Sequence, residues 1–144
     1  MFYAPESRVT RDLDFVLQLE LFGLPKASIL TDIGFYTSNA AGTYMHDETP
    51  FTLEIVPGPL AVGGSTLATY DTFRKGSLVL HVISATDSVK DRLAHGAYFH
   101  DVNAVRQAGE VAKAHEVDLN AVRAWGEAEG AMHTYELFQT FYRA

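Results

Sequence analysis

Proline is confined to one part of this chain, and that asymmetry constrains the fold more than any other feature. Residues 85–143 contain no proline, whereas residues 12–82 hold short β-like runs that glycine and proline interrupt. A proline inside a helix removes a hydrogen bond and clashes with the preceding turn, so a long proline-free stretch favours helices. We therefore expect an α+β protein, with a small mixed β-sheet in residues 1–83 and an α-helical half in residues 84–144. At 144 residues the two parts are expected to form a single domain.

Apolar patterning predicts the strands of the first half. Asp12–Gln18 and Phe51–Val56 alternate between apolar and polar residues, as half-buried strands do, and Phe51 is expected to face inward. The nearly continuous apolar run Ser77–Val82 predicts a strand in the interior of the sheet. A short helix is expected over Leu24–Ile33, with Gly34 as its stop. A strand pair is expected at Phe35–Thr37 and Thr43–His46, and a loop at Pro57–Gly64.

Four helices are expected in the second half. Ser84 or Thr86 caps the first and Asp118 caps or opens the third, because such side chains accept hydrogen bonds from the first helical turn. The last helix carries an aromatic face that is expected to pack against the body of the protein, with a dimer surface as the alternative. The first helix is expected to end near Phe99 and the second to span Val102–His115. The third is expected to run from Asp118 to near Gly130, and the fourth to span Met132–Tyr142.

Composition restricts the functional classes. Hydrophobic residues make up 47% of the chain and charged residues 20%, which is typical of a globular protein. There is no apolar run of about 18 residues and no apolar signal core in Met1–Arg11, so we expect neither membrane association nor export. The sequence has no cysteine, which excludes disulfides and fits a cytoplasmic location. The net charge of −7 argues against DNA binding, including by a helix-turn-helix over Val111–Trp125, because phosphate contacts need Lys and Arg.

Two carboxylates stand at the head of the first expected strand. At positions i and i+2 of a strand, Asp12 and Asp14 project from the same face, where like charges repel unless a cation lies between them. Such oxygen ligands suit Mg²⁺, which commonly takes one or two protein carboxylates plus substrate phosphates. Glu54 lies on the polar face of another expected strand and joins them if the two strands are neighbours. The alternative is a solvated strand end and an exposed sheet face.

Basic residues follow the start of the first long helix. Arg92 binds phosphate in bidentate fashion and Lys90 binds it as a point charge, so the two suit a phosphate clamp. Asp101 lies further along the chain. The alternative is a solvated helix face whose ion pairs contribute little to stability.

Together, five stretches resemble a group of small bacterial proteins related to the AbiEii-type nucleotidyltransferase toxins of toxin-antitoxin systems. The resemblance runs from about residue 8 to residue 130. Its more specific parts are the Pro-Gly-Pro-Leu-Ala-Val-Gly and Val-Lys-Asp-Arg-Leu-Ala segments. The five stretches are Thr10–Val16, Leu53–Gly63, Thr86–Ala94, Val117–Leu119 and Trp125–Gly130.

This resemblance implies a polymerase-β-like nucleotidyltransferase fold and a function for each candidate residue. Asp12 and Asp14 match the metal-binding pair, and Glu54 matches the third carboxylate, which together would hold Mg²⁺. Lys90 and Arg92 match basic residues that approach the phosphates of a nucleoside triphosphate, and Asp101 matches an acidic residue that follows them. The implied activity is transfer of a nucleoside monophosphate from the triphosphate to an acceptor that the sequence does not identify.

The sequence departs from the family pattern before Asp12. Family members carry a Gly-Ser turn about ten residues before the Asp pair, whose backbone N–H groups bind the triphosphate at a helix N-terminus. The eleven residues before Asp12 contain no glycine, and Gly63-Gly-Ser65 comes too late in the chain to replace that turn. Two interpretations stay open: a piece of a longer gene, or a variant without the phosphate site. The alternative function is therefore a catalytically inactive protein that binds a protein partner or forms a homo-oligomer.

Overall fold

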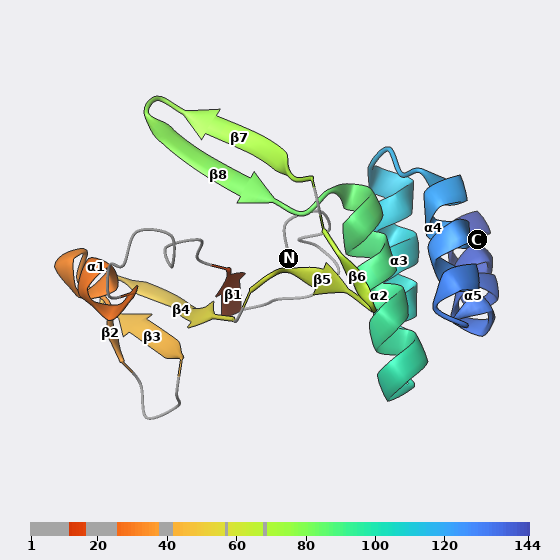
Figure 1. The fold of residues 1–144 in the computed structure, drawn as a ribbon, viewed down its shortest axis with the longest axis horizontal. Coiled ribbons are helices and arrows are strands. Elements are labelled where there is room, and N and C mark those ends of the chain that lie inside the picture. The colour runs from red at the N-terminus through yellow and green to blue at the C-terminus, as the bar shows by residue number, and fades with distance from the viewer. Residues whose placement is uncertain (1–11, 17–25, 38–41, 57, 68) are drawn as a thin grey trace. The chain divides into compact units, whose positions relative to one another are not determined.

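The structure, a computed structural model, describes residues 12–16, 26–37, 42–56, 58–67 and 69–144. It confirms the expected α+β class, because a small mixed sheet in the N-terminal half precedes four helices in the C-terminal half (Figure 1). The chain divides into two compact units at the boundary between Leu60 and Ala61. The sheet unit comprises the described residues up to Leu60, and the helical unit comprises those from Ala61 to Ala144.

The sheet unit contains one mixed sheet. Its strands are β1 (Asp12–Phe15), β2 (Tyr36–Thr37), β3 (Thr43–His46) and β4 (Thr49–Ile55). They lie in the order β1-β4-β3-β2, and β1 pairs parallel with β4 while the other two pairs are antiparallel. Parallel neighbours need a long connection. The chain between β1 and β4 supplies it and includes α1 (Lys26–Asp32) and the β2–β3 pair.

The short helix and the strand pair confirm the prediction for this segment. The backbone N–H of Gly34 donates to the carbonyl of Thr31 at 3.0 Å, and Gly34 has a φ of +90°, which favours glycine as the helix stop. Residues 24 and 25, the turn at 38–41 and residues 17–18 of the first predicted strand lie outside the described residues. The predicted inward position of Phe51 is wrong, since its side chain is 41% exposed. Among the described residues, β1 begins opposite Thr52, so Phe51 has no paired residue on that side.

Four helices form the bulk of the helical unit, as predicted. They are α2 (Ala85–Phe99), α3 (Val102–Ala114), α4 (Leu119–Ala128) and α5 (Met132–Arg143). Ser84 caps α2 by accepting a hydrogen bond from the backbone N–H of Asp87 at 3.0 Å. The carboxylate of Asp118 caps α4 in the same way, accepting from the N–H groups of Asn120 and Ala121.

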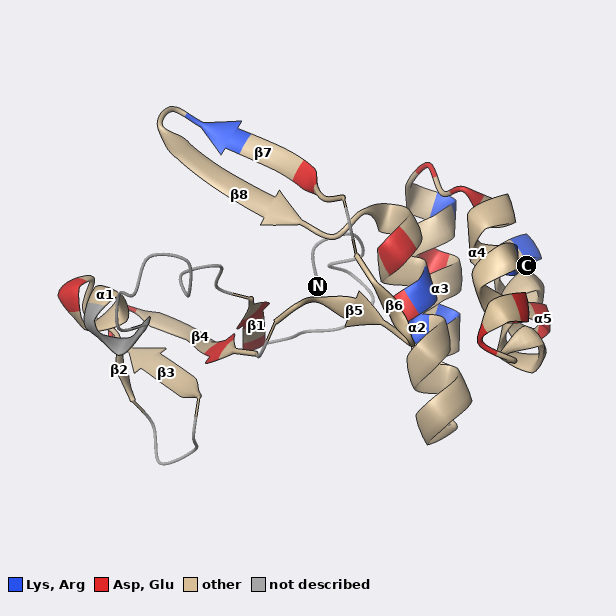
Figure 2. Cartoon of the chain, viewed as in Figure 1, with Lys and Arg blue, Asp and Glu red and all other residues tan. Residues whose placement is uncertain are grey.

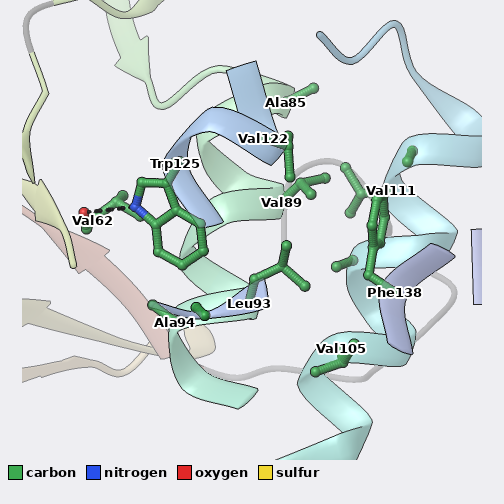
Figure 3. Close-up of a cluster of buried hydrophobic side chains, with 13 residues drawn as sticks. Val62, Ala85, Val89, Leu93, Ala94, Val105, Val111, Val122, Trp125 and Phe138 are labelled. Carbon is green, nitrogen blue, oxygen red and sulfur yellow. Dashed lines mark hydrogen bonds between the residues drawn. The ribbon is translucent and has the colours of Figure 1, made fainter. Parts of the chain in front are cut away.

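The main core lies between these helices. Figure 3 shows side chains from all four converging on one apolar cluster. Close helix contact depends on small residues: a Cβ at Gly109 in α3 would lie 2.9 Å from Cβ of Phe141 in α5. The largest side chains that are fully buried are Val89, Leu93, Val105, Val111, Val122 and Phe138.

A tight hairpin contributes to this core. β5 (Ala61–Val62) and β6 (Ser65–Thr66) pair antiparallel around Gly63 and Gly64. The side chain of Val62 is buried, and its carbonyl accepts a 3.3 Å hydrogen bond from Nε1 of Trp125 (Figure 3). The prediction that Pro57–Gly64 is a loop is therefore wrong at Ala61 and Val62, where burial of Val62 stabilises a strand; Pro57 lies outside the described residues.

A second hairpin corrects another prediction. β7 (Asp71–Lys75) and β8 (Leu78–Val82) pair antiparallel as a separate two-stranded sheet. The prediction that Ser77–Val82 lies in a sheet interior is wrong, because β7 is the one strand that pairs with β8 among the described residues, and Leu78 is 70% exposed. A short apolar run does not specify how many strands surround it.

The aromatic face of α5 packs against the helical unit, as the preferred interpretation predicted. Phe138 is fully buried, and Tyr135, Phe141 and Tyr142 are half-buried against the same core. Its aromatic rings also contact one another, with centroids of Phe138 and Tyr142 5.9 Å apart. Within the described part of the chain, no helix is both long and apolar enough to cross a membrane.

Candidate functional site

The register between β1 and β4 brings the three predicted carboxylates to one face of the sheet. Asp14 pairs with Glu54 and Asp12 pairs with Thr52. Paired residues of parallel neighbours project to the same face, and adjacent strands lie about 4.8 Å apart. Asp14 and Glu54 are therefore lateral neighbours, with Asp12 about 6.6 Å from Asp14 along the strand. Figure 2 shows these acidic positions on β1 and β4.

Two threonine hydroxyls orient these carboxylates. Oγ1 of Thr52 donates to Oδ1 of Asp12 at 2.8 Å, across the β1–β4 pair. Oγ1 of Thr43 donates to Oε1 of Glu54 at 3.3 Å. Thr43 lies on β3, the other neighbour of β4, and pairs there with Glu54. Neither threonine was predicted as part of the site. For Thr52 a signal was present, because it stands two residues before Glu54 and so shares its face.

The donor set suits a hard cation that is shared with a substrate. The side chains of Asp12 and Asp14 are exposed to solvent, and Glu54 is half-buried. No three His, Asp, Glu or Cys side chains among the described residues stand close enough together to hold a metal ion by themselves. Mg²⁺ does not require such a group, because it is commonly bound by one or two carboxylates and completes its coordination with water and substrate phosphate oxygens. The adjacent pair of Asp14 and Glu54 meets this requirement.

Lys90 belongs to a hydrogen-bonded group at the start of α2. Its Nζ lies 2.9 Å from Oδ1 of Asp87, and both side chains are largely buried. Oδ2 of Asp87 accepts a 2.8 Å hydrogen bond from the capping hydroxyl of Ser84. The three polar residues thus form one network, in which Lys90 already has an anionic partner.

Arg92 bonds to its own helix. Its Nη1 donates to the carbonyl of Ser88 at 3.2 Å and to the hydroxyl of Ser88 at 2.9 Å. Lys90 and Arg92 are both only partly exposed. Both belong to the helical unit, whereas the three carboxylates belong to the sheet unit.

Asp101 caps a helix and does not lie beside Lys90. Its Oδ1 accepts hydrogen bonds from the backbone N–H groups of Asn103 and Ala104, which makes it the N-cap of α3. It follows the C-terminal end of α2. Phe99 lies nine residues after Lys90 in α2, a rise of about 13.5 Å, so the structure does not bring Asp101 to Lys90. An Asp directly before a helix is typical of an N-cap, so the sequence could have predicted the capping role of Asp101.

Comparisons with known proteins identify no family for this chain. No protein-family model matches it, and searches of curated proteins and of solved structures find no match either.

Proposed function

We propose that this chain is a nucleotidyltransferase-like protein that transfers a nucleoside monophosphate from a nucleoside triphosphate to an acceptor with the help of Mg²⁺. The observation that carries the proposal is the in-register pairing of Asp14 with Glu54 on adjacent parallel strands, with Asp12 on the same face. Carboxylates that are lateral neighbours repel each other, and a bound cation relieves that repulsion.

The chain's own residues would divide the work. Asp14 and Glu54 would hold the metal, and the hydroxyl of Thr43 keeps the Glu54 carboxylate oriented. Asp12, which accepts a hydrogen bond from Thr52, lies further along the same face. A metal held there would supply neutralisation of the phosphate charge while the acceptor bonds to the α-phosphorus and pyrophosphate leaves. Lys90 and Arg92 lie in the helical unit, where they contact Asp87 and Ser88, and the proposal rests on the carboxylates of the sheet unit alone.

The test is isothermal titration of each nucleoside triphosphate, with and without Mg²⁺, into the full chain. Asp14→Asn keeps the size of the side chain and removes the charge that faces Glu54. We expect Mg²⁺-dependent binding of at least one triphosphate to the unmodified protein, weakened at least about tenfold by Asp14→Asn, since ligation of the metal is lost.

Glu48→Gln is the matched control. Glu48 lies in the turn before β4, six residues from Glu54 and therefore about 20 Å along the strand, and its replacement removes the same charge. It should bind as the unmodified protein does, and circular dichroism should show both variants folded. The proposal fails if no triphosphate binds, or if both variants lose binding equally, and the inactive binding-protein alternative then takes its place.

A further inference from the structure

We propose that Tyr36, with Met45 beside it, is the platform on which the base of the nucleoside triphosphate stacks. The proposal rests on the proposed nucleotidyltransferase function and places the base on the sheet face that carries Asp14 and Glu54. A metal held by carboxylates recognises phosphate oxygens and leaves the base without a partner. The platform would supply that missing contact and so determine which bases the protein prefers.

The pairing of β2 with β3 places Tyr36 and Met45 side by side. The two residues lie directly opposite each other in the antiparallel register, so their side chains project to the same face. The preceding Phe35 and the following His46 make a ring contact, with centroids 5.0 Å apart. Because successive side chains of a strand alternate between faces, this contact independently directs Tyr36 and Met45 to the opposite face.

That opposite face is the one with the carboxylates. Thr43 and Met45 stand two residues apart in β3 and share a face, and Thr43 pairs with Glu54 on β4. The β3–β4 pairing contains one irregularity, over which β3 advances by two residues and β4 by four. The difference is even, so the faces of both strands are preserved. From the spacings of a regular sheet, the backbone of Tyr36 lies about 12 Å from that of Glu54.

The ring of Tyr36 is exposed and held in one orientation. Tyr36 is 47% exposed and Met45 is 40% exposed. The hydroxyl of Tyr36 donates a 2.8 Å hydrogen bond to Oδ1 of Asp47, in the turn that follows β3. A side chain that is already ordered loses less conformational entropy when a ligand binds. The hydrogen bond to Asp47 therefore prepares the ring for stacking.

An aromatic ring next to a thioether suits a nucleobase. Every base has a π-face that stacks on an aromatic side chain, and the contact needs no particular hydrogen-bonding pattern. The flexible and polarizable side chain of Met45 adapts to the part of the base that extends past Tyr36. The two-ring bases cover more of this platform than the one-ring bases do. We therefore expect ATP and GTP to bind more tightly than CTP and UTP.

The experiment separates the base from the phosphates by isothermal titration of the full chain in the presence of Mg²⁺. Each nucleoside triphosphate is compared with inorganic tripolyphosphate, which has the phosphate chain and no base. Tyr36→Thr removes the ring and introduces a residue that favours strands. It should weaken binding of ATP about tenfold, remove the preference for purines, and leave binding of tripolyphosphate unchanged, because stacking alone is lost.

Two further variants identify the ring as the cause. Tyr36→Phe keeps the ring and removes the hydrogen bond to Asp47, so it should bind ATP more tightly than Tyr36→Thr does. Tyr70→Thr is the matched control, since Tyr70 is a 38% exposed tyrosine of the helical unit. It should bind every ligand as the unmodified chain does. Circular dichroism should show all three variants folded.

The outcomes distinguish a failure of the platform from a failure of the metal site. If neither the triphosphates nor tripolyphosphate bind the unmodified chain, the nucleotidyltransferase proposal fails and the platform fails with it. If ATP binds with Mg²⁺ and Tyr36→Thr leaves its affinity unchanged, the metal site stands and the platform alone is overturned. The platform is also overturned if Tyr36→Phe loses as much ATP affinity as Tyr36→Thr, or if the unmodified chain does not prefer purines.

Discussion

Glu129 joins three elements of the helical unit through its carboxylate. Oε2 accepts a 2.6 Å hydrogen bond from the hydroxyl of Tyr98 in α2, and Oε1 accepts a 2.9 Å bond from the backbone N–H of Gly64. The bond from Tyr98, followed by that from Gly64, lowers the pKa of Glu129. The hydrogen bond to Glu129 likewise raises the pKa of Tyr98. A Cβ at Gly63 would lie 2.7 Å from the carboxylate, so the turn fits Glu129 only with glycine there.

Glu129 should therefore make stability depend on pH. A carboxyl whose pKa is lower in the folded state stabilises the protein above its unfolded pKa and loses this effect as the pH falls through the folded value. Glu129→Gln cannot ionise, so we expect the difference in unfolding free energy from the unmodified chain to be largest near neutral pH. It should shrink below about pH 4.5, the ordinary value for this group. Urea unfolding at a series of pH values, followed by the fluorescence of the single tryptophan, measures it.

Tyr98→Phe tests the cause of that effect. It removes the largest contribution to the lowered pKa of Glu129 and keeps the aromatic ring. The effect of Glu129→Gln on the unfolding free energy should depend on pH more strongly in the unmodified chain than in the Tyr98→Phe background. The second comparison uses Tyr98→Phe and the double variant Tyr98→Phe/Glu129→Gln. An equal difference in the two backgrounds contradicts the assignment to the Tyr98 hydrogen bond.

At the candidate site, the sequence predicts side-chain faces better than it predicts partners. Spacing alone places Asp12 and Asp14 on one face of a strand, and the structure agrees. That β1 pairs with β4 depends on a contact between residues 40 positions apart, for which local pattern holds no information. The bond from Thr52 to Asp12 depends on the same register, and the bond from Thr43 to Glu54 depends on the register of β3 with β4. Asp101 shows the opposite limit, since the resemblance gives it a place in a nucleotide site, whereas the structure shows it as the N-cap of α3.

Among the elements, the helices, their ends and the β2–β3 pair could be predicted, whereas the surroundings of the later strands could not. Helix caps are local, so Ser84 and Asp118 mark the starts of α2 and α4 in the sequence itself. β7 contains three charged residues and gives little apolar signal, while the apolar run of β8 suggests an interior position. Burial of Val62 arises from contact with Trp125, 63 residues away, so the sequence near β5 carries no sign of it.

Two glycines in the helices differ in the space around them. A Cβ at Gly109 in α3 would lie 2.9 Å from Cβ of Phe141 and 3.2 Å from its backbone carbon. A Cβ at Gly126 in α4 would make ordinary contacts, the nearest being 3.5 Å from Sδ of Met132. Alanine favours a helix interior over glycine by about 1 kcal/mol, so intrinsic propensity alone predicts that both substitutions stabilise.

We expect the two substitutions to have opposite effects. Gly109→Ala forces α3 and α5 apart, and overpacking of this kind costs about 1–3 kcal/mol, which exceeds the gain in propensity. Gly126→Ala should be neutral or stabilising by up to about 1 kcal/mol, because its neighbours leave room. Urea unfolding of both variants gives the comparison. Equal effects of the same sign would mean that the contact between α3 and α5 does not determine the spacing of these helices.

For the whole molecule, the apolar core is distributed unequally between the two units. Of the apolar residues that are buried in the described parts of the chain, Leu30 belongs to the sheet unit and the others lie from Val62 to Phe138. Burial of apolar surface is the main favourable term in folding. The helical unit therefore has the larger source of stability. Trp125, the single tryptophan, lies in that core and reports on the helical unit alone.

This distribution predicts that the two units unfold separately. In urea, far-ultraviolet circular dichroism should show an early change from the sheet unit and a later one from the helical unit, whereas Trp125 fluorescence should follow only the later change. Phe138→Ala leaves a cavity beneath α5 and should lower the free energy of the later transition by about 3–5 kcal/mol. Leu30→Ala, in the sheet unit, should lower only the free energy of the early transition, by about 2–5 kcal/mol.

If circular dichroism and fluorescence instead change together in the unmodified chain, and Leu30→Ala shifts the Trp125 signal as well, the chain unfolds as one cooperative unit despite its divided core.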